Sequence, residues 1–495
     1  MSIVPTVVRA TPTAVGAGRG YRTLWRWHFY AGLFVMPFLV VLAITGTIYC
    51  FQPQLEPLLY PHRLIVTPNA SPRLSEDALL ARARAAMPPG AVATTARIAP
   101  RAERSAEFIF RLPSGRKESV YLNPYDGTVL GTLDVDRRFM QVDRMIHRAL
   151  LLGKPGELLM ELVACWTLVM IGTGIALWWP REREGAPLRT SLLSDLTRRG
   201  RPLWKSVHAT LGLWLAIGLM AFVVTGLPWT GSWGKQFKAL ATSVNLGTPP
   251  GAWGGLRLRS DLPGRSAAPG STATREASSR EMDSMPGMTM DDMPLPQVPW
   301  AVGAVHVPQM PQAPNAGAPR AEPLSLARIV ALMRETGLTD GYDVALPTSP
   351  EGVYTVSYFP ADPKLERTVY IDQYSGTVLK DIRYRDYGAI GKAVSYGTSL
   401  HMGRYFGVAN QIVCSALSLG LAALAVTGAV MWWKRRPSGT FGAPARERAA
   451  PPMRAWRAAL VVLGVVFPLM GATLVAVAVV DRFVFGRTRE PAVGS

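Results

Sequence analysis

Two pairs of histidines occupy matching places in a duplicated sequence, and this repeat limits what the chain can form more than any other feature. The first pair is His28 and His208, each followed at plus 4 by glycine and at plus 17 by Thr-Gly. The second pair is His147 and His401, each followed at plus 26 by Thr-Gly and at plus 31 by Trp-Trp. Each half of the chain therefore carries one histidine of each kind.

Five apolar runs are long enough to cross a bilayer, whose hydrocarbon core takes about 20 apolar residues of helix. We expect five transmembrane helices, at residues 27–51, 156–180, 206–230, 405–433 and 458–480. No small-residue cleavage site follows the first run, so we interpret it as a retained anchor. The sequence thus predicts a membrane bundle of α-helices built from a duplicated unit.

The positive charge is placed so that it orients this bundle. The formal net charge is +19, and residues 19–26, 181–205 and 434–457 hold 17 Lys and Arg but four Asp and Glu. These stretches fall on one side of five alternating spans, and the positive-inside rule makes that side the cytoplasm. The N-terminal segment 1–26 is then cytoplasmic and the tail 481–495 is periplasmic. Nothing else in the sequence supports nucleic acid as a partner of these cations.

The two long regions between spans, 52–155 and 231–404, lie on the outer side in this topology and resemble each other. Each predicts a helix, two strands, a tight turn and a further strand. The helices and first strands are expected near 76–86, 107–112 and 118–123, and near 324–336, 353–359 and 368–372. The hairpins read VYLNPYDGTVL and VYIDQYSGTVL, so each half carries the same small α+β domain.

An insert at residues 254–322 interrupts the second half and is rich in Pro, Gly, Ser, Ala and Met. We expect it to be disordered or loosely packed. Thioether sulfur is a soft ligand that selects Cu(I), and an imidazole could join it. The candidate copper ligands are Met282, Met285, Met288, Met290, Met293 and His306. The alternative is a compositionally biased linker whose methionines bind nothing.

The repeat gives the histidine pairs a common chemistry. If the two halves pack about a pseudo-two-fold axis, His28 meets His208 near the cytoplasmic side and His147 meets His401 near the outer side. Two imidazoles without nearby Cys, Asp or Glu make a poor zinc site. They do complete the coordination of a haem iron, so the sequence predicts two b-type haems. Nearby arginines could pair with the haem propionates: Arg22, Arg26, Arg144, Arg148 and Arg404.

The three cysteines, Cys50, Cys165 and Cys414, lie within or at the edge of apolar runs and form no CxxC motif. We interpret them as small packing residues, with no disulfide framework and no covalent haem attachment.

The repeated VY…Y.GTVL hairpins, the four histidines and the Thr-Gly…Trp-Trp endings resemble the PepSY-associated transmembrane helix family, often labelled iron-regulated membrane proteins. The resemblance covers nearly the whole chain outside the insert, and it places PepSY-like domains at residues 75–132 and 323–382. It implies a multi-pass protein of the bacterial inner membrane, similar to ferric-siderophore reductases. In such a protein, electrons reach a periplasmic metal complex through haem, and the enzyme class implied is a ferric-chelate reductase.

The electron donor must be a separate cytoplasmic flavoprotein or quinol, because no dinucleotide fingerprint is present. Two other functions stay open. The chain could be a copper reductase or a copper-handling membrane protein that uses the Met-rich insert. It could also be a non-enzymatic module whose PepSY-like domains bind a protein or peptide, which predicts no haem.

Overall fold

The computed structural model describes residues 20–99, 101–179, 192–256, 258–261, 322–437, 442, 444 and 453–483. The chain divides into two compact units. The first comprises Met1–Val41, Met160–Val223 and Leu419–Ser495, and the second comprises Leu42–Leu159 and Val224–Ser418. Each unit is described separately below.

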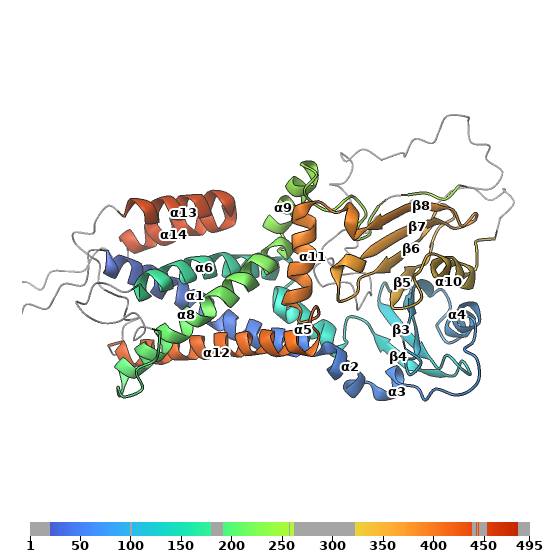
Figure 1. Cartoon of the computed structure of the whole chain (residues 1–495), viewed down its shortest axis with the longest axis horizontal. Coiled ribbons are helices and arrows are strands. Elements are labelled where there is room, and N and C mark those ends of the chain that lie inside the picture. Colours follow the sequence, from blue (N-terminus) through green and yellow to red (C-terminus); the bar gives the residue numbers. More distant parts are fainter. Residues whose placement is uncertain are drawn as a thin grey trace, which may run out of the picture. The chain divides into compact units, whose positions relative to one another are not determined.

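Among the described residues, four helices are long and apolar enough to cross a membrane. They are α1 (Tyr21–Cys50), α6 (Lys154–Trp178), α8 (Arg201–Gly226) and α12 (Val408–Arg435), labelled in Figure 1. Their bounds lie within a few residues of the first four expected spans. This protein is therefore a membrane protein with several spanning helices.

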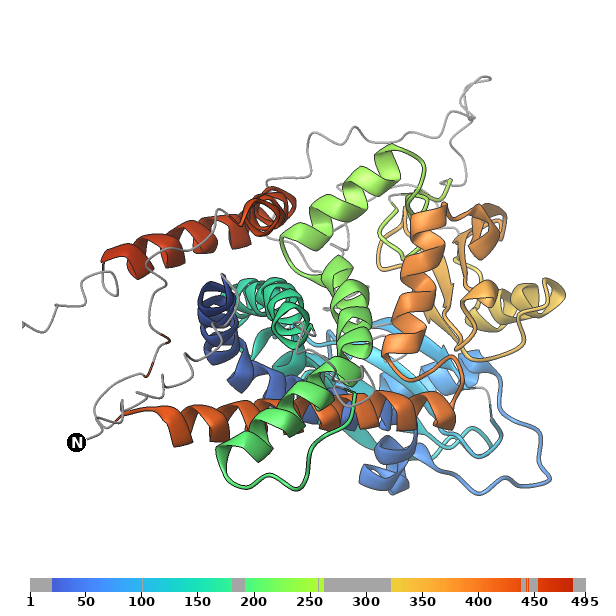
Figure 2. The same ribbon diagram turned by 60° about the vertical axis from the view of Figure 1, so that its left-hand side comes forward.

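The expected fifth span, 458–480, is not one helix. It consists of α13 (Arg454–Val466) and α14 (Pro468–Phe483), each shorter than the length needed to cross a bilayer. The chain bends at Phe467 because Pro468 lacks an amide hydrogen and cannot continue the preceding helix. Gly464 and Gly471 face each other inside the bend, and a Cβ on Gly471 would lie 2.6 Å from the Gly464 carbonyl oxygen. Figure 2 shows the two helices leaving the bend in different directions.

Shorter helices belong to the second unit. They are α2 (Gln52–Leu59), α3 (Pro61–Leu64), α4 (Glu76–Ala85), α5 (Phe139–Ala149), α9 (Trp233–Ser243), α10 (Leu326–Glu335) and α11 (Ala389–His401). Ser75 and Ser325 begin α4 and α10 in the same way, because each serine hydroxyl accepts a hydrogen bond from the third amide of its helix. The duplicated sequence thus produces the same N-terminal cap on α4 and α10.

The strands of both halves form one antiparallel sheet of eight strands. They are β1 (Val92–Ile98), β2 (Ala106–Arg111), β3 (Lys117–Leu122), β4 (Val129–Asp134), β5 (Tyr342–Ala345), β6 (Val353–Tyr358), β7 (Arg367–Asp372) and β8 (Val378–Arg383). The order is β4-β3-β2-β1-β5-β6-β7-β8. The sequence prediction missed β1 and β5, and these are the strands that pair to join the halves.

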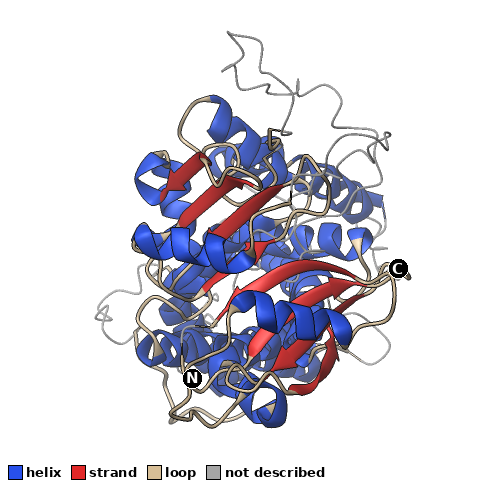
Figure 3. Cartoon of the chain, turned by 90° about the vertical axis from the view of Figure 1, so that its right-hand side faces the viewer, coloured by secondary structure: helices blue, strands red, loops and turns tan. Residues whose placement is uncertain are grey.

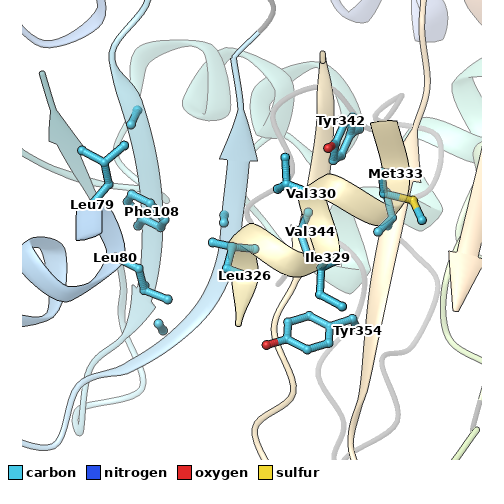
Figure 4. Close-up of a cluster of buried hydrophobic side chains, with 14 of the residues drawn as sticks. Leu79, Leu80, Phe108, Leu326, Ile329, Val330, Met333, Tyr342, Val344 and Tyr354 are labelled. Atoms are coloured by element: carbon cyan, nitrogen blue, oxygen red, sulfur yellow. The ribbon is translucent and has the colours of Figure 1, made fainter. Parts of the chain in front are cut away.

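Helices α4 and α10 lie across one face of this sheet (Figure 3). Their apolar side chains share one core with alternate strand residues, because successive side chains of a strand point to opposite faces. Figure 4 shows Leu79 and Leu80 beside Phe108, and Leu326, Ile329 and Val330 beside Val344 and Tyr354. The two predicted small domains are therefore packed as one layered body.

The opposite face of the sheet differs between the halves. In the first half, Glu107 is buried and forms ion pairs with Arg97 and Arg138, and Tyr121 donates a hydrogen bond to it. In the second half, an apolar cluster occupies part of the corresponding face. Val353, Tyr370 and Ile382 pack there against Ala252 and Tyr387.

Candidate functional site

Each of the four repeated histidines contacts the threonine of a Thr-Gly dipeptide on another helix. The Nδ1–Oγ1 distances are 3.1 Å for His28 and Thr173, 2.8 Å for His147 and Thr45, 2.9 Å for His208 and Thr427, and 2.8 Å for His401 and Thr225. The contacts are reciprocal: α1 carries His28 and the threonine that holds His147, and α8 carries His208 and the threonine that holds His401. The same contact between a histidine Nδ1 and a threonine Oγ1 therefore occurs four times.

The threonines determine which imidazole nitrogen carries the proton. A hydroxyl has one hydrogen to donate. Thr173 donates to the Val169 carbonyl at 2.6 Å, and Thr427 donates to the Leu424 carbonyl at 2.9 Å. Each Oγ1 can then only accept from the histidine, so Nδ1 is the protonated nitrogen. Nε2 keeps its lone pair, as a metal ligand must.

The glycine after each threonine lets the imidazole lie against the helix backbone. A Cβ on Gly174 would lie 3.2 Å from Cε1 of His28, and one on Gly428 would lie 3.4 Å from Cε1 of His208. The corresponding distances are 3.3 Å for Gly46 and His147, and 3.7 Å for Gly226 and His401. Side chains at the two tightest positions would push the ring away from its threonine.

His28 and His208, both in the first unit, face each other with ring centroids 6.3 Å apart and ring planes at 81°. A metal ion bonded to one nitrogen of each ring at about 2.0 Å would hold the centroids at most about 6 to 6.5 Å apart. The observed separation fits one metal centre between the two rings. Gly32, on the next turn of α1, has open space beside it, whereas a Cβ on Gly212 would lie 3.6 Å from a Leu424 methyl group.

His147 and His401, both in the second unit, lie on the short helices α5 and α11 that precede two of the spans. The left-handed residues Leu150 and Leu151 end α5 and turn the chain into α6. Burial lowers the pKa of His147 to about 4, and burial followed by the proximity of His147 lowers that of His401 to about 3. Both imidazoles are therefore neutral at physiological pH, the form that binds metal.

The donor set suits a metal that brings its own equatorial ligands. Within the described residues, no group of three or more His, Cys, Asp or Glu is placed to hold a metal ion. A structural zinc site needs about four protein ligands, but haem iron needs one or two. Two oriented imidazoles in each unit thus fit a haem and do not fit a bare ion.

Residues 25–435 match the family model described as the PepSY-associated TM region. The chain belongs to this family. All four histidines and their threonine partners fall inside the matched range. A comparison with curated proteins gives no significant match. Family membership therefore establishes a PepSY-associated membrane protein, and the chemistry of the site is argued from this chain's own residues.

The candidate arginines differ in their surroundings. Arg148 pairs with Glu157 at 3.0 Å, so its charge is already balanced. Arg404 donates to the Phe359 carbonyl at 2.7 Å, and burial lowers its pKa. Arg26 donates hydrogen bonds to the Tyr30 hydroxyl at 2.8 Å and to the Pro444 carbonyl. Arg22 is exposed. Of the five, Arg144 and Arg404 best suit an anionic group beside His147 and His401, because each lies three residues from one of these histidines and burial lowers its pKa.

Two features of the site escaped the sequence analysis. The Thr-Gly dipeptides were markers of the repeat, but nothing local indicated that each one faces a histidine more than 100 residues away. Asp143, one helical turn before His147, is buried, and its Oδ2 lacks a hydrogen-bond partner among the described residues. Burial raises the pKa of Asp143 to about 7. Its spacing of four residues from His147 was a usable signal.

The candidate copper ligands Met282, Met285, Met288, Met290, Met293 and His306 lie outside the described residues. Copper binding by the insert stays a prediction from the sequence.

Proposed function

We propose that this PepSY-associated protein is a b-type haem protein of the bacterial inner membrane. It passes electrons from the cytoplasmic side to a metal complex in the periplasm, a ferric siderophore. The observation that carries the proposal is the fourfold His–Thr–Gly arrangement, which yields two pairs of oriented imidazoles. Interfacial histidines that bound nothing would not need the same threonine contact at four equivalent places.

In this function the protein would hold the haems, orient their histidine ligands and enclose the ligand nitrogens. His28 and His208 would hold one haem, and His147 and His401 the second. When bound, the haems supply one-electron redox chemistry. The four threonine contacts fix the direction of each ring, Thr173 and Thr427 also fix the Nδ1–H tautomer, and a hydrogen bond at Nδ1 raises the basicity of Nε2. Burial of the rings keeps water away from the ligand nitrogens.

The direction of electron flow rests on the placement of charge in the sequence. The basic loops 181–205 and 434–457 put His28 and His208 near the cytoplasm by the positive-inside rule, with the N-terminus inside. The donor would be a cytoplasmic flavoprotein or a membrane quinol. The acceptor would lie near the outer sheet, beside His147 and His401. Reduction to Fe(II) weakens the hold of hard oxygen ligands, so the chelator releases its iron.

The methionine run supports a second candidate, reduction of Cu(II) followed by capture of Cu(I) on thioether sulfur. Both candidates need the same haem centres and differ only in the acceptor.

The test is a reduced-minus-oxidised visible spectrum of the purified full chain, with the haem content per protein. Low-spin b-type bands at about two haems per chain are expected. The reduced protein is then mixed with a ferric siderophore or with a Cu(II) chelate, and the rate of haem reoxidation identifies the acceptor. Absence of haem after expression with ample haem supply would refute the reductase and leave the PepSY binding module.

A further inference from the structure

Two of the three cysteines, distant in sequence, lie together in the second unit. Cys50 is the last residue of α1, and Cys414 lies in the second turn of α12. Both side chains are 4% exposed, and their thiols are hydrogen-bonded to each other. The sequence motifs gave no indication of this contact, because 364 residues separate the two positions.

The surroundings favour one of the two sulfurs as the reactive one. The Cys414 Sγ accepts a hydrogen bond from the Asn410 side-chain amide at 3.2 Å and lies beside the Cys50 thiol. As a thiol, Cys414 donates to the Leu400 carbonyl at 3.2 Å. An amide donor and a neighbouring thiol beside this sulfur favour its thiolate, which is the nucleophilic form of cysteine.

The duplication does not require this pair. Cys50 follows Thr45 by five residues, and the matching place after Thr225 holds Thr230. Cys414 follows His401 by 13 residues, and the matching place after His147 holds Met160. The thiols therefore meet at one of two equivalent positions, where the two halves of the chain meet.

We propose that Cys50 and Cys414 form a redox-active thiol pair that a hydroperoxide oxidises to a disulfide. The Cys414 thiolate attacks one peroxide oxygen, the O–O bond breaks, and the sulfur becomes a sulfenic acid while the other oxygen leaves as hydroxide. Cys50 then attacks the Cys414 sulfur, an S–S bond forms and water leaves. In sum, two thiols and hydrogen peroxide give one disulfide and two waters. A small uncharged peroxide suits thiols this deeply buried.

The disulfide would tie the outer end of α1 to α12 beside the outer histidine pair. Thr45, five residues before Cys50 on α1, holds His147. The Leu400 carbonyl, which contacts Cys414, belongs to the residue before His401. Oxidation would therefore fix the helix segments that orient both outer imidazoles. Ferrous iron generates peroxide when it meets oxygen, so a protein that releases Fe(II) would meet this oxidant on its outer side.

The test uses the full chain in detergent and needs no cofactor, so its outcome is independent of the haem proposal. The protein is treated with hydrogen peroxide, denatured, alkylated and mapped by mass spectrometry. We expect a Cys50–Cys414 cross-linked peptide that dithiothreitol reverses, with Cys165 still alkylated. Cys165 is an internal control, since it is 1% exposed and lies in a membrane helix like the other two. Oxidation of all three cysteines at equal rates, or of none, would overturn the proposal.

Single variants assign the roles of the two sulfurs. Cys50→Ser should stop at a sulfenic acid on Cys414, which dimedone traps, whereas Cys414→Ser should leave Cys50 unreactive. Cys165→Ser should cross-link like the parent protein. A sulfenic acid on Cys50 in the Cys414→Ser variant would reverse the assignment. The experiment on the unmodified protein decides the main point even if a variant fails to fold.

Discussion

The two halves of this protein are alike at the histidines and different on the sheet. Each half supplies two imidazoles, each with Nδ1 on a threonine and its ring over a glycine. On the sheet face away from α4 and α10, the first half buries Glu107 between two arginines, and the second half packs Tyr370 against apolar side chains. A buried sheet face can be filled either by an ion pair or by apolar side chains. A pair of histidines that binds one centre needs the same geometry from both histidines.

Removal of one histidine should have the largest effect on the site to which both halves contribute. His208→Ala in the second half, and His28→Ala in the first, should each lower the haem content from about two to about one per chain, because both variants lose the same centre. The measurement is haem content by reduced-minus-oxidised spectroscopy with protein quantitation. Loss of both haems from either variant, with the protein still folded, would contradict two separate sites.

The sheet difference can be tested by removing the buried charge of the first half. Glu107→Gln leaves Arg138 without its carboxylate, and breaking a buried ion pair costs about 3 to 5 kcal/mol. We expect a matching fall in the thermal stability of the detergent-solubilised protein. The control is Thr355→Val, at the equivalent strand position of the second half, which should change stability by no more than about 0.5 kcal/mol. Equal losses for the two variants would show that the charges are not a special feature of the first half.

Acid should destabilise the first half through the same residue. Burial alone would raise the pKa of Glu107, but the charges of Arg138 and Arg97 outweigh burial and lower the pKa to about 2. The folded state therefore binds its proton at lower pH than the unfolded chain, so Glu107 stabilises the fold above about pH 4.5. A contribution of about 3 kcal/mol should disappear as the pH falls from about 4.5 to 2. Melting curves of Glu107→Gln over this range should lack that part of the acid dependence.

Substitution of the threonines tests the similarity of the two halves with a smaller expected effect than removal of a histidine. Thr173→Val and Thr427→Val keep the shape of the side chain but remove the acceptor for Nδ1–H, and loss of such a partner weakens metal binding by about 10- to 100-fold. Both changes act on the His28–His208 pair and should weaken haem binding equally, as measured by haem titration of the apoprotein. Thr167→Val is the matched control, since Thr167 is buried in the same helix and bonds only its own backbone. A weakening by Thr167→Val of the same size would refute the role of the Nδ1 contact.

The sequence predicted the elements that depend on local pattern. Apolar runs located α1, α6, α8 and α12 to within a few residues, because desolvation of a spanning helix requires a continuous apolar stretch. The pattern failed where a local break competed with it. Residues 458–480 are apolar enough for a span, but the backbone bends at Phe467–Pro468. Strands β1 and β5 were missed because their place in the sheet depends on their pairing with each other, across about 250 residues of chain.

The sequence by itself determined that two similar halves lie in a membrane and that four histidines recur in them at equal spacing. The tertiary structure decided which groups meet: each histidine with a threonine of another helix, β1 with β5, and Cys50 with Cys414. The physical reason for this division is the distance along the chain over which each kind of sequence pattern acts. Periodicity and spacing report the environment of a segment over a few turns, whereas a contact between distant residues exists only after the helices and strands have packed.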